Sequence, residues 1–398
     1  AGNGDHQGSG RVGGDGVIRM KIKDICDLQN GRAFKPSDWE TAGLPIIRIQ
    51  NLNDERAPFN YYGGKYNLAQ EVDNGDLLFS WSGTPGTSFG AFLWNRGKGV
   101  LNQHIFKVIP KVEVDKTYLM YALNGNISTI ISKAHGGVGL QHITKKELDE
   151  IEIQMVSISR QKKIVEILEK ISLLIFLRKQ QLAKLDELVK ARFVEMFGDC
   201  KTNPKNWKTK ALEKIANVGS SKRVFAEELQ DSGIPFYRGT EIGALAEKKA
   251  VIPALFITEE HYKQLCETTG KPQKGDLLMP SICPDGRIWI VDTDEPFYFK
   301  DGRVLWVHLT SANYNSVFLL YTLKDRIMTD YASIASGTTF AELKIFALKK
   351  CKIFDVPLEL QNQFANFVER VDQQKQTVQQ SLEKLELMKK ALMQEYFG

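Results

Sequence analysis

The sequence predicts an α+β protein in which one structural unit occurs twice. Three observations support this fold class. Short segments recur 200 positions apart, each copy ends in about forty residues with the periodicity of a long helix, and the residues between alternate strand-like runs with turn-rich segments. At 398 residues the chain is also too long for one ordinary core, and two globular domains of roughly 130 to 160 residues account for its length.

The duplication is based on residues that match in both halves of the chain. Every matching pair has the same separation (275 − 75 = 361 − 161 = 397 − 197 = 200). The pairs are 75–78 and 275–278, which both read Gly-Asp-Leu-Leu, Gln161 and Gln361, and Phe197 and Phe397. We interpret Gly-Asp-Leu-Leu as structural, because Gly and Asp form tight turns and leucines enter a core. Such a chain presents two similar but non-identical surfaces, which suits the reading of two half-sites on one ligand.

The repeat divides the chain into five parts. The Gly-rich residues 1–20 lack the apolar stretch of a secretory signal, so we interpret them as a disordered leader or a tag. The other parts are a globular domain at 21–157, a long helix at 158–200, a second globular domain at 201–356 and a second long helix at 357–398.

Both globular domains are predicted to mix strands with short helices. Runs of β-branched and aromatic residues bounded by turn residues indicate the strands. In the first domain the candidate strands are 46–49, 77–81, 91–94 and 105–109, and the candidate helix is 118–132.

Apolar residues in each long helix follow a three-then-four spacing, from Ile164 to Met196 and from Phe364 to Tyr396. At 1.5 Å per residue each helix is about 60 Å long, and a single apolar stripe on a solvated helix needs a partner. The other copy is the available partner, so we expect an antiparallel coiled coil with an internal pseudo-twofold relation between the halves. An ordinary dimerisation zipper or a buried core helix is the alternative reading of such a stripe.

Composition narrows the class of protein. A hydrophobic content of 42% and a charged content of 25% are typical of a soluble globular protein, and no run of about 18 apolar residues could span a membrane. The five cysteines form no Cys-x-x-Cys pair, which favours neither a disulfide framework nor a zinc site and fits the reducing cytoplasm. The net charge of +5 is only mildly basic.

Motifs that would carry catalysis are missing from the sequence. The Gly-rich segment 83–88 lacks the lysine of a phosphate-binding loop, and the Asn/Asp-Pro-Pro-aromatic motif of adenine methyltransferases does not occur. The six histidines show no metal-ligand spacing. We therefore expect no enzyme activity, no cofactor and no metal.

The order of these segments closely resembles the specificity (S) subunit of type I restriction-modification enzymes. The resemblance is carried by Gly-Leu-Pro-Ile-Ile-Arg-Ile-Gln-Asn-Leu at 43–52, by Gly-Asp-Leu-Leu and by 148–153 leading into Gln161. The second half repeats the order with 233–239, 275–280 and 358–361, so that the match runs from about Lys21 to Gly398.

The resemblance implies two target-recognition domains, each of which reads one half of a bipartite sequence in double-stranded DNA. It also implies that the long helices set the spacer between the half-sites and dock methyltransferase (modification) subunits, and that restriction (translocase/nuclease) subunits are further partners. Because the two domains differ at Gln50-Asn51 and Thr240-Glu241, we expect an asymmetric target. Because the net charge of +5 is only mildly basic, we expect other subunits to supply part of the neutralisation of the DNA phosphates.

Candidate DNA-binding residues of the first domain lie in a predicted strand, a Gly-rich loop and the segment before the helix. If 48–53 is a strand, alternate side chains share one face, and Arg, Gln and Asn pair with guanine and adenine edges. Alternatively, Arg48 pairs with a carboxylate such as Asp76 and the amides close a turn, the loop is a plain hairpin connection, and the two lysines form a solvated helix start. The candidates are Arg48, Gln50, Asn51, Ser82, Thr84, Thr87, Gln141, Lys145 and Lys146.

Candidates of the second domain occupy corresponding turn-rich positions. Hydroxyls near glycines can approach phosphates, and arginines bind phosphate or guanine. Alternatively, the arginines serve surface salt bridges or hold the equivalent loop. The candidates are Arg238, Thr240, Arg287, Arg303, Thr338 and Thr339.

Two other classes of protein remain open at this stage. One is a stand-alone enzyme such as a DNA methyltransferase with its own recognition domain, which the missing cofactor motifs argue against. The other is a coiled-coil adaptor whose twin globular heads bind protein partners.

Overall fold

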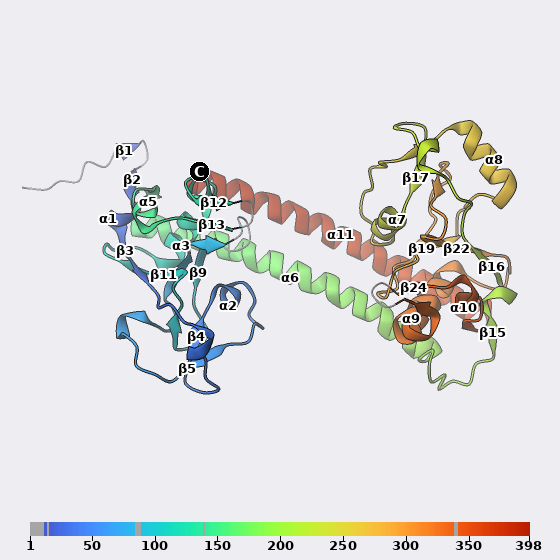
Figure 1. Cartoon of the computed structure of the whole chain (residues 1–398), viewed down its shortest axis with the longest axis horizontal. Coiled ribbons are helices and arrows are strands. Elements are labelled where there is room, and N and C mark those ends of the chain that lie inside the picture. The colour runs from blue at the N-terminus through green and yellow to red at the C-terminus, as the bar shows by residue number, and fades with distance from the viewer. Residues whose placement is uncertain (1–11, 14–15, 84–88, 138–139, 338–340) are drawn as a thin grey trace, which may run out of the picture. The chain divides into compact units, whose positions relative to one another are not determined.

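The computed structural model describes residues 12–13, 16–83, 89–137, 140–337 and 341–398 (Figure 1). The chain divides into two units. Unit 1 comprises Ala1–Lys179 and Gln379–Gly398, and unit 2 comprises Gln180–Val378. Each unit therefore contains one globular head together with parts of both long helices.

The two predicted long helices are confirmed. Helix α6 (Ile158–Phe197) and helix α11 (Leu358–Phe397) each contain forty residues and pack together (Figure 1). In unit 2, Asp186 of α6 lies 2.6 Å from Lys375 of α11, while the rings of Phe193 and Phe364 lie 5.5 Å apart. Since residue numbers rise along one helix as they fall along the other, the pair is antiparallel, as the pseudo-twofold relation between the halves predicts.

The head of unit 1 contains two four-stranded and two three-stranded sheets. One four-stranded sheet is antiparallel throughout and has the order β3-β11-β7-β9. Its strands are β3 (Cys26–Asn30), β11 (Ile105–Pro110), β7 (Leu77–Ser80) and β9 (Gly90–Leu93). The other strands are β1 (Val12–Gly13), β2 (Val17–Lys21), β4 (Leu44–Ile47), β5 (Asn60–Tyr62), β6 (Glu71–Val72), β8 (Ser82–Gly83), β10 (Gly99–Leu101), β12 (His135–Gly137), β13 (Leu140–His142) and β14 (Glu152–Met155). The short helices are α1 (Ile22–Ile25), α2 (Ile49–Asn53), α3 (Lys116–Gly125), α4 (Ile127–Ser132) and α5 (Lys145–Asp149).

The head of unit 2 repeats this plan. Its four-stranded sheet has the order β16-β22-β19-β20, made of β16 (Ala216–Gly219), β22 (Val304–Leu309), β19 (Leu277–Pro280) and β20 (Trp289–Ile290). The other strands are β15 (Thr209–Ala211), β17 (Ile234–Tyr237), β18 (Phe256–Ile257), β21 (Tyr298–Phe299), β23 (Ala335–Ser336), β24 (Glu342–Leu343) and β25 (Lys352–Phe354). The short helices are α7 (Gly239–Ala246), α8 (Glu259–Thr269), α9 (Ser316–Ile334) and α10 (Ile345–Lys349).

Gly-Asp-Leu-Leu is structural in both heads, as predicted. The glycines have positive φ values of 82° at Gly75 and 91° at Gly275, which a residue with a side chain adopts only at a cost. The aspartates accept backbone N–H groups three residues upstream, and all four leucines are buried. These turns start β7 and β19, the strands inside each four-stranded sheet.

Two predicted elements differ from the structure. The expected strand at 46–49 ends at Ile47, and residues 49–53 form helix α2 instead. The expected helix at 118–132 is divided into α3 and α4 at Asn126, whose side chain donates to the carbonyl oxygens of Ala122 and Phe397. The expected strands at 77–81, 91–94 and 105–109 correspond to β7, β9 and β11 within one residue at each end.

A buried glutamine joins each head to the start of its long helix. In unit 1 the side-chain oxygen of Gln161 accepts the N–H of Asp115, 2.9 Å away, and its amide donates to Val156 at 2.8 Å. In unit 2, Gln361 makes the same two bonds, to Asn315 at 2.9 Å and to Val356 at 2.8 Å. Asp115 and Asn315 cap helices α3 and α9, so one amide fixes two helix starts in each unit.

The last phenylalanine of each long helix is buried in a head. Phe397 of α11 packs against Tyr118 of α3 in unit 1, with ring centroids 5.3 Å apart. Phe197 of α6 packs against Phe318 of α9 in unit 2, with centroids 4.8 Å apart. The two contacts are related by the 200-residue repeat, and each holds the end of one helix against the helix that packs on a head's sheet.

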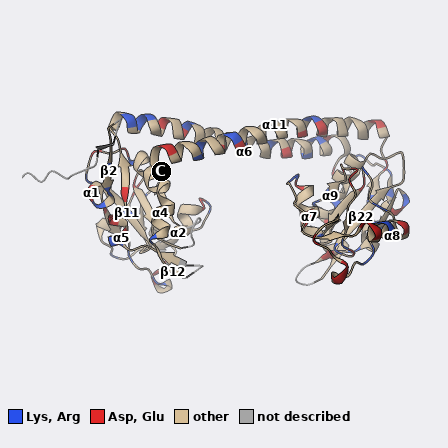
Figure 2. Ribbon diagram, turned by 90° about the horizontal axis from the view of Figure 1, so that it is seen from above, with Lys and Arg blue, Asp and Glu red and all other residues tan. Residues whose placement is uncertain are grey.

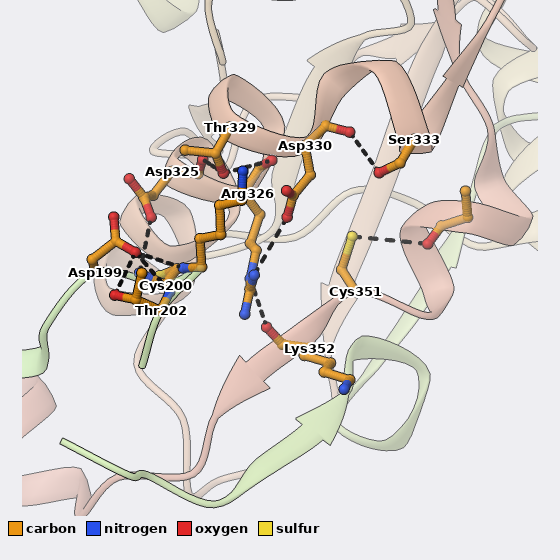
Figure 3. A network of polar contacts seen from close by, with 12 residues as sticks. Asp199, Cys200, Thr202, Asp325, Arg326, Thr329, Asp330, Ser333, Cys351 and Lys352 are labelled. Carbon is orange, nitrogen blue, oxygen red and sulfur yellow. Dashed lines mark hydrogen bonds and ion pairs between the residues drawn. The ribbon is translucent and has the colours of Figure 1, made fainter. Parts of the chain in front are cut away.

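Polar contacts fix the chain that follows α6 in unit 2 (Figure 3). Asp199 accepts the backbone N–H and the hydroxyl of Thr202, which closes a turn after the helix. Arg326 of α9 binds the Asp330 carboxylate at 3.3 Å and the carbonyl oxygen of Lys352 at 3.2 Å (Figure 3).

No helix in the described part of the chain is both long enough and apolar enough to cross a membrane.

Candidate nucleic-acid interface

Arg48 begins helix α2 at the end of strand β4. Its backbone N–H donates to the side-chain oxygen of Asn51, 3.0 Å away, so the amide caps the first turn of the helix. The interpretation of 48–53 as a strand is therefore wrong, because this local bond favours a helical turn over continued pairing. Arg48 also does not pair with Asp76, whose carboxylate lies 2.7 Å from Lys107.

Asn51 lies inside the head and its amide is satisfied there. Only 2% of the residue is exposed, and its nitrogen donates to the carbonyl oxygens of Ala57 and Pro58, each 3.2 Å away. Gln50 beside it is exposed and donates one bond, of 3.4 Å, to Pro58. Of these two amide candidates, Gln50 is the one that is accessible in the present conformation.

Aromatic rings and neutral oxygens hold three arginines of unit 1. The guanidinium of Arg48 lies 5.3 Å from the Trp39 ring centroid and donates to the Asn60 side chain, and Arg96 lies 4.2 Å from the Phe59 ring. Arg32 lies 4.7 Å from the ring of Tyr62. Within the described residues, none of Arg32, Arg48 and Arg96 forms an ion pair. Their charge is thus oriented by stacking and is not cancelled by a carboxylate.

The remaining described candidates of unit 1 lie on β8, β13 and α5. Ser82 of β8 is buried, and Gln141 of β13 pairs with Gly83. The side-chain oxygen of Gln141 is buried and has no hydrogen-bond donor among the residues that the structure describes. Lys145 and Lys146 are exposed at the start of α5, which Thr144 caps, so they form the solvated helix start considered above. Thr84 and Thr87 lie outside the described residues.

In unit 2 a carboxylate accompanies each candidate arginine. Arg238, which begins α7 as Arg48 begins α2, donates through Nη2 to Glu241 at 2.6 Å, and Thr240 donates to the same carboxylate at 2.8 Å. Arg287 lies 2.8 Å from Asp285, and Arg303 pairs with Glu342. Thr338 and Thr339 lie outside the described residues.

The surface salt bridges considered for the second domain are therefore present. Figure 2 shows basic and acidic residues on both heads and interspersed along the two long helices. The arginines described above nevertheless differ between the heads. Aromatic rings hold Arg32, Arg48 and Arg96 in unit 1, whereas carboxylates accompany the three candidate arginines of unit 2.

Arg32 and Arg96 were not among the candidates that the sequence suggested. Both stand two positions from an aromatic residue, in Arg32-Ala33-Phe34 and Trp94-Asn95-Arg96. This interleaving of basic and aromatic residues was the available signal, but the main ring partners of these arginines, Tyr62 and Phe59, are distant in sequence.

Metal ligands and cysteine thiols are the remaining reactive groups of the heads. In the described part of the chain, no group of three or more His, Cys, Asp or Glu residues is placed to hold a metal ion. Burial raises the pKa of the Cys26 and Cys283 thiols to about 12, so neither supplies a thiolate near neutral pH.

Comparison with known proteins identifies the family. The sequence matches the type I restriction modification DNA specificity domain twice, over residues 15–187 and 204–387. The protein S.HindORF215P of Haemophilus influenzae, named as a type I restriction enzyme specificity subunit, is 25% identical over 388 residues, which cover 87% of this chain and 92% of that protein.

Solved structures support the same assignment at the level of the fold. The type I restriction-modification S subunit from M. genitalium aligns with a TM-score of 0.55 at 16% identity, covering 98% of each chain. A chain from a structural study of type I restriction-modification complex assembly and conformational transition gives a TM-score of 0.61 at 15% identity, covering 96% of this chain and 98% of that one. The chain belongs to the family of type I restriction-modification specificity subunits. It is a non-catalytic component that serves recognition of a DNA target.

Replacing the two neighbouring amides separates a structural role from an exposed one. Asn51→Ala removes a helix cap and leaves buried carbonyl oxygens without a donor, so we expect a loss of about 1 to 3 kcal/mol in the free energy of unfolding. Gln50→Ala should change it by less than about 0.5 kcal/mol, because its one bond is long and exposed. Urea denaturation of both variants measures the difference, and equal losses would contradict the burial of Asn51.

Proposed function

We propose that each head reads one half of a bipartite, asymmetric target in double-stranded DNA. The observation that carries this proposal is the paired position of Arg48 and Arg238, each of which begins the helix after a matching strand in its own head. A guanidinium at such a position can bind a base edge with two acceptors or a phosphate. Different neighbours, Asn51 in one head and Glu241 in the other, favour different half-sites.

The chain would act with other subunits in the cytoplasm. We propose double-stranded DNA, methyltransferase (modification) subunits and restriction subunits as its partners. The net charge of +5 is small for a protein that binds DNA alone, which supports a shared contribution to phosphate neutralisation.

The two arginines should contribute to different half-sites. In a complex with the methyltransferase subunits, we expect Arg48→Ala to weaken binding by about 1 to 3 kcal/mol on DNA that depends on one half-site, and Arg238→Ala to do so on the other. Binding to oligonucleotides with either half altered measures the effect. Arg370→Ala on the exposed face of α11 is the matched control, and it should leave both half-sites unchanged.

Two results would count against this assignment. If both variants lose the same affinity on every altered oligonucleotide, the arginines support folding and do not read separate half-sites. A lowered melting temperature in both variants would lead to the same conclusion.

We also propose that the long helices set the spacer between the half-sites. Each is an uninterrupted helix of forty residues that contributes side chains to both units. The heptad spacing that buries residues such as Leu185 and Val378 would tie the two helices into one element whose length is fixed by residue number.

Insertion of one heptad into both helices tests the spacer proposal. Seven residues keep the apolar seam in register and add about 10 Å, which corresponds to about three base pairs of DNA. Selection from a library with randomised spacers should therefore yield a spacer longer by about that amount with unchanged half-sites. An unchanged spacer in a folded variant would refute the proposal.

Docking of methyltransferase subunits is proposed on α6. Within unit 1 this helix exposes a run of large apolar side chains, namely Leu173, Leu174, Phe176 and Leu177, which we call the α6 apolar patch. More than half of Leu173 (56%) and of Phe176 (55%) is exposed, although the opposite face of the helix packs into the core with Leu168 and Ile171. An exposed cluster of this kind on a heptad helix favours a protein partner.

Substitution in the α6 apolar patch should impair assembly without unfolding the chain. We expect Leu173→Ser with Phe176→Ser to reduce affinity for the methyltransferase subunit about tenfold or more, since burial of one large apolar side chain contributes about 1.5 to 3 kcal/mol. Ile252→Ser, at a residue that is 91% exposed in the head of unit 2, is the control. Co-purification and light scattering measure assembly, and equal assembly of both variants would exclude this patch.

A further inference from the structure

Glu241 occupies the position in unit 2 that Asn51 occupies in unit 1. Both are the third residue of the helix that Arg238 or Arg48 begins, and both accept the backbone N–H of that arginine, Glu241 at 2.9 Å and Asn51 at 3.0 Å. The N-cap bond is thus common to the two heads. The charge of the accepting side chain differs between the heads, because the amide of Asn51 in one head is replaced by the carboxylate of Glu241 in the other.

The Glu241 carboxylate also binds the side chain of Arg238. Its oxygens lie 3.2 Å from Nε and 2.6 Å from Nη2, so they occupy the guanidinium edge that carries these two nitrogens. A guanidinium has five N–H donors in a planar fork, so the Nη1 side stays available for a second acceptor group. Among the residues that the structure describes, Nη1 of Arg238 has no acceptor.

In the pair of Glu241 and Arg238, the carboxylate is the inner group and the guanidinium is the outer one. The Glu241 side chain is only 12% exposed, whereas that of Arg238 is 45% exposed. Burial opposes ionisation of Glu241, but the hydrogen bonds from Arg238, Thr240 and the backbone lower its pKa to about 2. The carboxylate is therefore ionised at neutral pH and lies beneath an arginine that faces solvent.

The other candidate arginines of unit 2 are held differently. Asp285 is more exposed than Arg287, so this carboxylate does not lie beneath its arginine. Arg303 binds Glu342 through Nη1, and the same carboxylate also lies 3.6 Å from Lys344. Among these three arginines, Arg238 alone has two of its nitrogens fixed by one carboxylate that is less exposed than the arginine.

We propose that Glu241 is a specificity-determining positioning residue that holds Arg238 by one edge and directs its remaining donors at a guanine. Guanine presents two acceptors, N7 and O6, on its major-groove edge, which match the spacing of a guanidinium fork. An arginine fixed in this way loses little conformational freedom on binding and is restrained from following a phosphate. The inference rests on the proposed function, since it deepens the reading of DNA by the head of unit 2.

Glu241→Gln is the critical variant, because a glutamine oxygen can keep the N-cap bond that Asn51 makes in unit 1 while the ion pair is lost. The wild-type complex with its methyltransferase subunits first defines the target by methylation mapping. Arg238→Ala then identifies the base whose discrimination depends on Arg238. We expect Glu241→Gln to reduce discrimination at that base by about tenfold or more with an unchanged melting temperature.

Salt dependence gives a second readout. A released Arg238 is free to bind a phosphate, so the slope of log K against log salt for non-specific DNA should steepen by about one unit in Glu241→Gln. Glu342→Gln adds the same charge beside Arg303 and should leave discrimination at the Arg238-dependent base intact.

Three results would overturn the inference. They are full discrimination in Glu241→Gln, an equal loss at every base with a lowered melting temperature, and an Arg238→Ala variant whose base preferences match the wild type. If the wild-type complex shows no preference for any sequence, the proposed function itself fails. That outcome is distinct, because it is measured before any variant is made.

Discussion

The buried amides of Gln161 and Gln361 are the constraint that fixes each head to the start of the long helix in its own unit. Each is almost fully removed from water and binds one backbone group before its long helix and another at the start of α3 or α9. An unpaired buried amide is costly, so the head and the helix start keep a fixed relation in each unit. The antiparallel four-stranded sheets pack on α3 and α9. The surface arginines of each head are therefore held at fixed positions relative to its long helix.

The two heads use different chemistry to hold the arginine that begins the helix after the matching strand. Stacking on Trp39 and Phe59 orients Arg48 and Arg96 without cancelling charge, whereas Glu241 orients Arg238 and neutralises it. An arginine held by a ring retains its full attraction for phosphates, but an arginine held by a carboxylate attracts them less and depends more on a matched acceptor pair. The difference is accompanied by a change at the third residue of the helix, which is Asn51 in one head and Glu241 in the other.

Much of the fold could be predicted from the sequence, because its signals are periodic or repeated. The heptad spacing predicted α6 and α11. The recurrence of Gly-Asp-Leu-Leu and of Gln161 as Gln361 predicted two equivalent units. The strand expected at 48–53 was wrong because one side-chain bond, in which the N–H of Arg48 donates to the side-chain oxygen of Asn51, outweighs the β-branched pattern before it. The division at Asn126 depends partly on Phe397, 271 residues away, and Arg96 is held by a carbonyl and a ring whose proximity only the tertiary structure creates. Pattern analysis therefore found Arg48 and Arg238, which begin helices, and missed Arg32 and Arg96, whose ring partners are distant in sequence.

The burial of Phe397 against Tyr118 has a consequence for synthesis of the chain on the ribosome. Unit 2 is one continuous segment, Gln180–Val378, whereas unit 1 also needs residues 379–398 to complete its core. The head that is translated first must therefore wait for the segment made after the whole second head, with the pocket for Phe397 beside Tyr118 still open. Nascent unit 1 exposes apolar surface throughout that interval. Unit 2 therefore completes its core before unit 1 does, although the head of unit 1 is translated first.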